Sequence, residues 1–238
     1  MYLYIVRHGE PDYVTDTLTE AGRAQAEAVG ARLACSGIDA IHASPMGRAV
    51  ETAEPLSKRL GLPVKIEPWA HEVGEESRTM FPDGVPKSVS YIPAEHLLSE
   101  EFRRMNSAEA LASVPGLCGS GYAERCRFIT EGLDEMLASY GYRRTPEGFY
   151  EPVAPNDKHI ALFCHCAMTR VLFSHLTNIP IQYVAASFLP HFTNVTLFYF
   201  DEAAAAPTQA RLISYGDIGH LYPEGSGAQI HQRYGNAF

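Results

Sequence analysis

Four short apolar runs in this 238-residue chain are each followed by polar residues that suit the binding of anionic groups. The carboxyl ends of parallel strands meet at one edge of an open α/β sheet, and ligands bind beyond that edge. If the runs are parallel strands, the polar residues converge on one rim. In chain order they are Arg7, His8 and Glu10; Arg48; His71, Glu72, Glu75 and Glu76; and Cys164, His165, Cys166 and Arg170.

Two histidines, two arginines and a carboxylate in one place predict a site for a phosphoryl group. A guanidinium group offers forked N–H donors that match the geometry of phosphate oxygens. Ser44 and Pro45 predict a helix start, with a capping serine and proline at the first position. That helix would add unpaired N–H groups and the positive end of its dipole to the same rim.

Strands and helices alternate along most of the chain. Thr19 predicts the cap of a helix that runs to about Ser36, and the helix after Pro45 carries an apolar stripe from Ala49 to Leu60. This alternation predicts parallel βαβ units and a three-layer α/β/α fold with a mostly parallel central sheet. The expected strands are residues 2–6, 38–43, 62–69, 159–165, 192–200 and 210–215.

Residues 74–120 interrupt this alternation with four prolines, several glycines and a polar helical stretch near 94–112. Because this segment holds too few apolar residues for its own core, we expect one domain over 1–238 with an insertion, or lid, at about 74–120. Residues 141–158 are expected to form an exposed loop and 217–238 a loose tail.

The composition excludes several classes of protein. A formal net charge of −9 argues against a nucleic acid or an anionic membrane as partner. No run approaches the roughly 18 apolar residues of a membrane span, and the start of the chain lacks the pattern of a secretion signal. Five cysteines without regular spacing argue against a disulfide framework. We therefore expect a soluble, cytoplasmic protein.

Taken together, the motifs resemble those of the histidine phosphatase superfamily, also called the phosphoglycerate mutase-like superfamily. "RHGE" alone is a weak match, but it gains specificity from "SPxxRAxET" about 35 residues later and a strand-ending histidine far downstream. The resemblance covers residues 1–76 and about 120–216. The matching segments are "VRHGE" at 6–10, "LTEAGRAQA" at 18–26, "IHASPMGRAVETA" at 41–53, Glu72, and "CHCAMTR" at 164–170.

The resemblance implies a phosphoglycerate mutase-like fold and gives roles to the rim residues. His8 would attack phosphorus and form a phosphohistidine, and Gly9 would let the backbone approach the phosphoryl group. Glu72 would protonate the leaving oxygen and later activate water. Neither a metal nor a cofactor is implied, because cationic side chains neutralise the phosphoryl charge. The residues expected to bind the substrate are Arg7, Gly9, Arg48, His165 and Cys166, with Arg7, Arg48 and His165 on the equatorial oxygens.

Two departures from the family pattern bear on the reaction. Cys166 stands where family members usually have glycine, next to the phosphate. Val14 stands where the mutase branch typically has asparagine, and only nine residues separate His8 from Leu18. A mutase must keep water away from the phosphohistidine, whereas a hydrolase must admit it. The compact loop therefore favours a phosphomonoester hydrolase over a mutase.

Other readings of the same residues stay open. Cys164 to Arg170 matches C-x5-R, the pattern of cysteine-dependent phosphatases, although the loop between them has no glycine. Cys164, His165 and Cys166 could hold zinc, but no second ligand pair is evident. A protein that binds a phosphorylated ligand without turnover is a further alternative. The expected partner is a phosphorylated small molecule, and the sequence is compatible with a homodimer.

Overall fold

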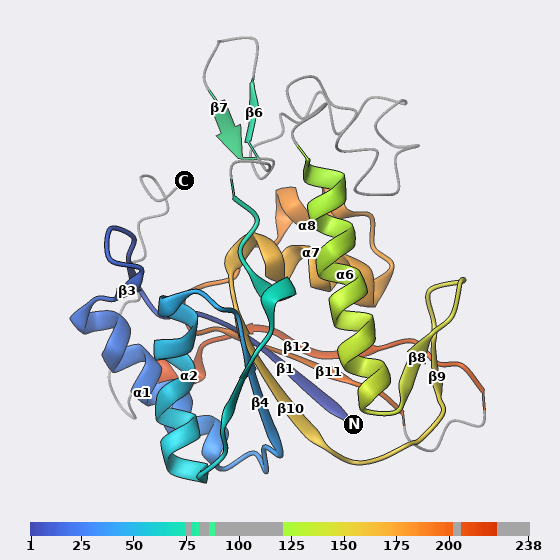
Figure 1. Ribbon diagram of the computed structural model, residues 1–238, viewed down its shortest axis with the longest axis horizontal. Helices are drawn as coiled ribbons and strands as arrows, with labels where there is room; N and C mark the ends of the chain where they lie inside the picture. Colours follow the sequence, from blue (N-terminus) through green and yellow to red (C-terminus); the bar gives the residue numbers. More distant parts are fainter. Residues whose placement is uncertain (75–77, 81–85, 89–120, 202–205, 223–238) are drawn as a thin grey trace.

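The computed structural model describes residues 1–74, 78–80, 86–88, 121–201 and 206–222, and its centre is a six-stranded sheet (Figure 1). The order across the sheet is β12-β11-β1-β10-β4-β5. Neighbours from β1 to β5 are parallel, while β11 runs antiparallel to both β1 and β12. The strands are β1 (Tyr2–Arg7), β4 (Ala40–Ala43), β5 (Val64–Ile66), β10 (His159–Cys164), β11 (Val195–Tyr199) and β12 (Arg211–Asp217).

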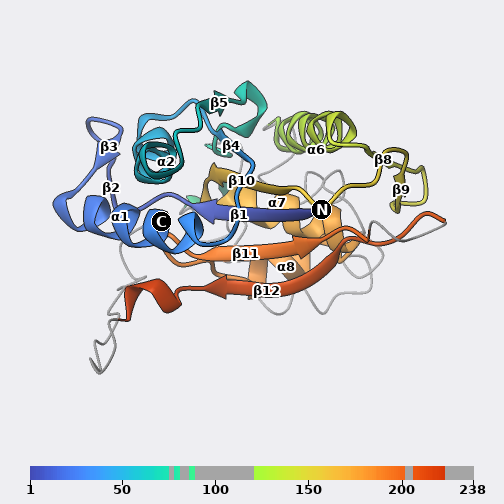
Figure 2. The same cartoon turned by 90° about the horizontal axis from the view of Figure 1, so that it is seen from below.

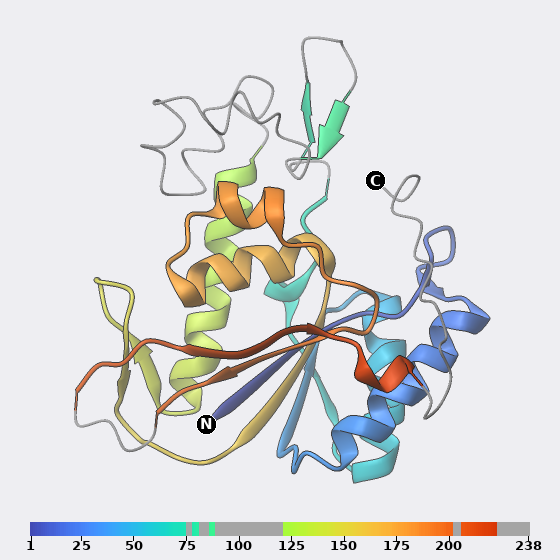
Figure 3. The ribbon, with the colours of Figure 1, turned by 180° about the vertical axis from the view of Figure 1, so that it is seen from behind.

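Helices cover both faces of the sheet, which confirms the predicted three-layer α/β/α fold. The helices α1 (Glu20–Ala34) and α2 (Gly47–Leu60) pack on one face, and α6 (Tyr122–Ser139), α7 (Cys166–Thr177) and α8 (Ile181–Ser187) pack on the other (Figures 2 and 3). Alternate residues of β1 supply the two cores. Tyr4 and Val6 face α1 and α2, whereas Leu3 and Ile5 face α6 and α7.

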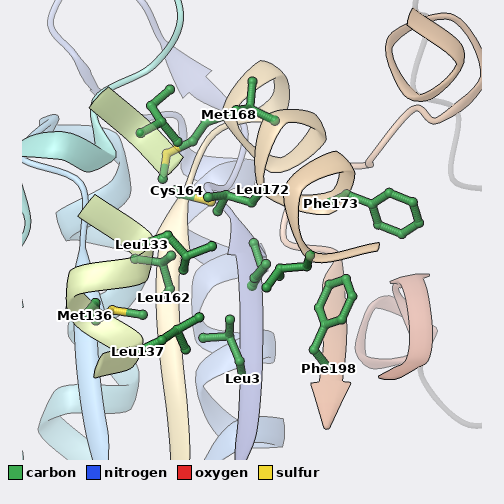
Figure 4. Close-up of a cluster of buried hydrophobic side chains, with 14 of the residues drawn as sticks. Leu3, Leu133, Met136, Leu137, Leu162, Cys164, Met168, Leu172, Phe173 and Phe198 are labelled. Atoms are coloured by element: carbon green, nitrogen blue, oxygen red, sulfur yellow. The ribbon is translucent and has the colours of Figure 1, made fainter. Parts of the chain in front are cut away.

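The core beneath α6 and α7 is the larger of the two. Leu133 and Leu137 of α6 and Leu172 of α7 surround Leu3 and Leu162 of the central strands (Figure 4). All five side chains are fully buried. The two innermost strands, β1 and β10, are therefore covered by apolar residues on both faces, as buried parallel strands require. The ends of these two strands, where the polar residues lie, are paired in register.

The expectation of an exposed loop over 141–158 is wrong. Strands β8 (Tyr142–Arg144) and β9 (Tyr150–Pro152) form a hairpin there. Tyr142 and Tyr150 are fully buried, and both rings pack against Phe200. Helix α6 is also missing from the elements expected from the sequence. Its buried residues recur at helical spacing, but charged residues stand between them and obscure the pattern.

Several short elements complete the described chain. Strands β2 (Pro11–Asp12) and β3 (Thr17–Leu18) form a small hairpin after β1, and a 3₁₀ turn, η1 (Pro68–Ala70), follows β5. Within the predicted insertion, β6 (Arg78–Met80) pairs with β7 (Pro86–Ser88). The expected helical stretch near 94–112 lies outside the described residues, and so does most of the expected tail, after the turn η4 (Gly219–Leu221). The single domain and its lid remain predictions.

No helix in the described part of the chain is both long enough and apolar enough to cross a membrane.

Candidate active site

His8 and His165 lie side by side at the ends of the two central strands. The parallel register of β1 and β10 pairs Arg7 with Cys164. His8 and His165 each follow directly, so the two histidines lie at the same level on neighbouring strands. The backbone N–H of His8 donates to the carbonyl of Cys164 at 2.9 Å. The two imidazole rings are tilted toward each other, with centroids 5.2 Å apart. The adjacency predicted for these residues is thus a direct consequence of strand pairing.

His8 is a buried, neutral imidazole with a defined tautomer. Its Nδ1 lies 2.7 Å from the carbonyl oxygen of Gly9. Because a carbonyl can only accept, Nδ1 carries the hydrogen and Nε2 keeps a lone pair. Burial, and next the positive charge of Arg7, lower the pKa of His8 well below its ordinary value. The Nε2 atom is therefore an unprotonated nitrogen at neutral pH.

Arg7 is held by a loop before β11 that sequence reasoning did not connect with the site. The guanidinium is almost fully buried and donates to the carbonyl of Pro190 at 2.7 Å. It also lies over the ring of Phe192, 4.1 Å from the ring centroid. The Phe192 ring is 5.9 Å from that of His8. Phe192 thus forms an apolar wall beside both residues, and no motif in the sequence pointed to it.

Arg48 stands in the first turn of α2, as expected, but the helix begins differently. Its first residue is Gly47 rather than Pro45, and the capping residue Met46 makes no side-chain cap. Asp16 takes over this task from the β2–β3 hairpin. Its carboxylate accepts from the N–H of Gly47 at 2.7 Å and forms an ion pair with the buried guanidinium of Arg48. Asp16 therefore both caps the N-terminus of α2 and holds the guanidinium of Arg48 in place.

Ser44, expected to cap α2, instead binds His165. Its Oγ lies 2.7 Å from Nε2 of His165, which is fully buried. Burial, then the nearby His8 ring and the positive charge of Arg48, lower the pKa of His165 well below its ordinary value. Ser44 follows β4 directly, so three adjacent strands, β1, β10 and β4, each contribute a side chain to this cluster.

Three buried polar atoms of the cluster have no hydrogen-bond partner among the described residues. They are Nε of Arg7, Nε of Arg48 and Nδ1 of His165. Buried donors are normally satisfied, so such a concentration in one place indicates that another group completes the site. An anion with several acceptor oxygens, such as a phosphoryl group, matches the two arginine donors, and Nδ1 of His165 joins them in the tautomer whose Nε2 accepts from Ser44.

Glu72 lies at the N-terminus of α7, beside His165. Its Oε1 accepts from the N–H groups of Val73 at 2.9 Å and Met168 at 3.0 Å, and its Oε2 accepts from that of Ala167 at 3.3 Å. The carboxylate is half-buried. The structure thus brings Glu72 to the same rim as His165, although the two are 93 residues apart.

The cysteines do not form the nucleophile site of a C-x5-R phosphatase. Burial raises the pKa of the Cys164 thiol to about 12, and its Sγ lies 3.6 Å from Oγ1 of Thr169. Nε of Arg170 donates to the carbonyl of Phe188 at 2.7 Å, toward α8. Cys166, also buried, begins α7 and does not have the positive φ that would favour glycine there. No metal-binding group of three His, Cys, Asp or Glu residues occurs in the described part of the chain.

The Asp16 contacts lead to a stability prediction. Asp16→Ala leaves the first N–H of α2 and the Arg48 guanidinium without their acceptor, so the free energy of unfolding is expected to fall by about 1 kcal/mol. Chemical denaturation measures this. Asp12→Ala is the matched control, because Asp12 lies in the same hairpin and its carboxylate accepts from the nearby Val14 N–H and from Thr15. Equal stability of the Asp16 variant and the unaltered protein would refute the capping role.

The buried neutral histidines predict that acid weakens the fold. The pKa values of His8 and His165 are lowered from the ordinary value of 6.5, so the unfolded chain binds more protons than the folded chain as pH falls below that value. The free energy of unfolding should therefore decrease between about pH 7 and about pH 5.5. Urea denaturation at both pH values tests this. A His8→Asn, His165→Asn double variant should show a smaller decrease, and an equal one would contradict the prediction.

Comparisons with known proteins bear on the family and the fold. Residues 3–77 match the family model of the histidine phosphatase superfamily (branch 1). The probable phosphoglycerate mutase GpmB of Photorhabdus laumondii is 27% identical over 166 residues, which cover 59% of this chain and 70% of that protein. The protein of the same name from Erwinia tasmaniensis is 31% identical over 141 residues, covering 48% of this chain and 65% of its own length.

Solved structures share the fold over nearly the whole chain. A mycobacterial glucosyl-3-phosphoglycerate phosphatase superposes with a TM-score of 0.57 at 22% identity, covering 90% of this chain and 98% of its own. Phosphoserine phosphatase of Entamoeba histolytica gives 0.59 at 17% identity, covering 93% and 99%. The first third of the chain thus matches the histidine phosphatase superfamily, and the solved structures share the fold over about nine-tenths of it, in agreement with the resemblance of the motifs. The names of these relatives include both mutases and phosphatases, so they do not choose between the two reactions.

Proposed function

We propose that this protein is a metal-independent phosphomonoesterase that acts through a phosphohistidine on His8. The main support for the proposal is the tautomer and neutral charge of His8. Its Nδ1 is tied to the Gly9 carbonyl, which leaves Nε2 with a lone pair. Around it, three buried polar atoms of Arg7, Arg48 and His165 lack partners in the described residues. A nucleophilic nitrogen in a cationic cup is the arrangement that phosphoryl transfer requires.

In the first step, the lone pair on Nε2 of His8 attacks the phosphorus of a bound monoester. The bond from phosphorus to the ester oxygen breaks, and a protonated Glu72 gives its proton to that oxygen. Arg7, Arg48 and His165 bind the three equatorial oxygens and stabilise their charge in the transition state. The products of this step are the free alcohol and a phosphohistidine.

In the second step, water attacks the phosphorus of the phosphohistidine. Glu72, now a carboxylate, takes a proton from the water, and the bond between phosphorus and Nε2 breaks. Inorganic phosphate leaves, and His8 returns to its neutral state. Burial and Arg7 favour that neutral state before each turnover, because they lower the pKa of His8.

The second candidate function is phosphoryl transfer between hydroxyl groups, which the names of the curated relatives favour. A mutase must shield its phosphohistidine from water. Here the segment after His8 is a compact hairpin, β2 and β3, and Val14 at its tip is 94% exposed. The hairpin offers no large cover for the site, which supports hydrolysis.

Release of phosphate in the presence of a chelator tests the proposal. The purified chain is incubated with EDTA and either p-nitrophenyl phosphate or a panel of phosphorylated metabolites. Steady release of inorganic phosphate is the expected result. Transfer between hydroxyls with little free phosphate would identify a mutase, and binding without turnover would identify a non-catalytic binding protein. The small-molecule substrate, the cytoplasmic location and a homodimer remain proposals.

A further inference from the structure

The turn that carries Glu72 is held from the side by helix α6. After η1 the chain has no regular structure as far as Gly74, so the place of Glu72 depends on tertiary contacts. Nη2 of Arg125, in the second turn of α6, donates to the carbonyl of Trp69 at 3.3 Å and also to the carbonyl of His71. One guanidinium therefore fixes two peptide groups immediately before Glu72.

A second contact from α6 locks the same turn. Trp69 is 7% exposed, and its indole N–H donates to Glu67 at 2.9 Å. Its ring lies against Gly132 so closely that a Cβ on that glycine would overlap the ring. Gly132 is seven residues beyond Arg125, and residues at this spacing share one face of a helix. The face of α6 that carries Arg125 and Gly132 thus packs directly against the turn.

Helix α7 holds the other end of the turn. The carboxylate of Glu72 accepts from the N–H groups of Ala167 and Met168, directly after His165. These contacts set the distance between Glu72 and the strand ends only if the backbone of the turn is itself fixed. A general acid must lie within hydrogen-bond reach of the leaving oxygen, and a misplacement of about 1 Å can cost about 10²-fold in rate.

We propose that Arg125 is a positioning residue that keeps Glu72 at the leaving oxygen. The proposal rests on the proposed function. Arg125 is half-buried, and both carbonyls to which its Nη2 donates belong to the turn that carries Glu72, so it is placed to act through that turn. Its loss frees the carbonyls of Trp69 and His71 and lets Glu72 move, while the contacts of Arg7, Arg48 and His165 are unchanged.

Leaving-group dependence separates this role from a general loss of structure. An alkyl phosphate needs protonation of its leaving oxygen, whereas p-nitrophenyl phosphate releases a stable phenolate. The measured quantity is kcat/KM, which reports the steps up to the first irreversible one, formation of the phosphohistidine. For Arg125→Ala we expect a loss of about tenfold or more with β-glycerophosphate and of less than about threefold with p-nitrophenyl phosphate. Arg127→Ala, an exposed arginine of the same helix, is the control and should change neither value.

A double-mutant cycle completes the test. In a Glu72→Gln background, Arg125→Ala should cause little further loss with β-glycerophosphate. Arg125→Gln, checked by thermal denaturation, replaces Arg125→Ala if the latter does not fold. Equal losses with both substrates, no loss with either, or additive losses in the Glu72→Gln background would each overturn the inference. Failure of the proposed function would look different, because the unaltered protein would hydrolyse neither substrate.

Discussion

His8→Ala is expected to lower kcat/KM for p-nitrophenyl phosphate by at least about 10⁴-fold. The substitution removes the imidazole whose tautomer the Gly9 carbonyl fixes, with the lone pair on Nε2. His165 is not expected to replace it, because the proposed mechanism uses that ring, held by Ser44 Oγ at 2.7 Å, to bind a phosphoryl oxygen. The remaining cationic groups can still bind a phosphoryl group, so inorganic phosphate should bind the variant with similar affinity.

Cys164→Ser is the matched control for that experiment. The thiol is buried, and its pKa is raised to about 12, so it is a poor nucleophile at neutral pH. The serine variant should keep kcat/KM within about threefold of the unaltered protein. Retained activity in His8→Ala together with lost activity in Cys164→Ser would contradict the account and favour a cysteine mechanism.

Arg48→Ala should give the second-largest effect, a loss of about 10²- to 10³-fold in kcat/KM. The guanidinium is almost fully buried, and Asp16 fixes its orientation at the N-terminus of α2. The substitution removes a positive charge from the place where negative charge accumulates on the phosphoryl oxygens in the transition state. Arg48→Lys should restore only part of the activity, because an ammonium group cannot reproduce the planar, forked donors.

Arg59→Ala on the same helix controls for the loss of positive charge. Arg59 is exposed and forms an ion pair with Glu27 on α1, at 2.8 Å. Steady-state kinetics should show no change beyond about twofold for this variant, because exposed charges contribute little. Equal kcat/KM values for Arg48→Ala and the unaltered protein would exclude Arg48 from the reaction.

The predicted convergence of His8, Arg48 and His165 followed from strand ends and one helix start. Both signals are local in the sequence, because an apolar run stops where the polar residue begins. The parallel pairing of β1 and β10 then brings the ends of these two strands together. For this reason the rim could be predicted without knowledge of the loops.

Other parts of the site depend on contacts between distant segments. Phe192 lies under Arg7, and Asp16 binds the start of α2, yet both belong to loops without a motif. Ser44 has the pattern of a helix cap but binds His165, because tertiary contacts outweigh a weak local preference. The same holds for the turn of Glu72, whose place is set by Arg125 from a helix that the sequence did not reveal.

Chemical trapping of the phosphoryl group tests the central claim most directly. The protein is quenched in alkali during turnover of a ³²P-labelled phosphomonoester, digested, and mapped by mass spectrometry. We expect label that is stable in alkali and lost in acid, as for a phosphorus–nitrogen bond, on the peptide that contains His8. Label on a peptide that contains Cys164 but not His8, or rapid turnover with no labelled protein at all, would contradict the account.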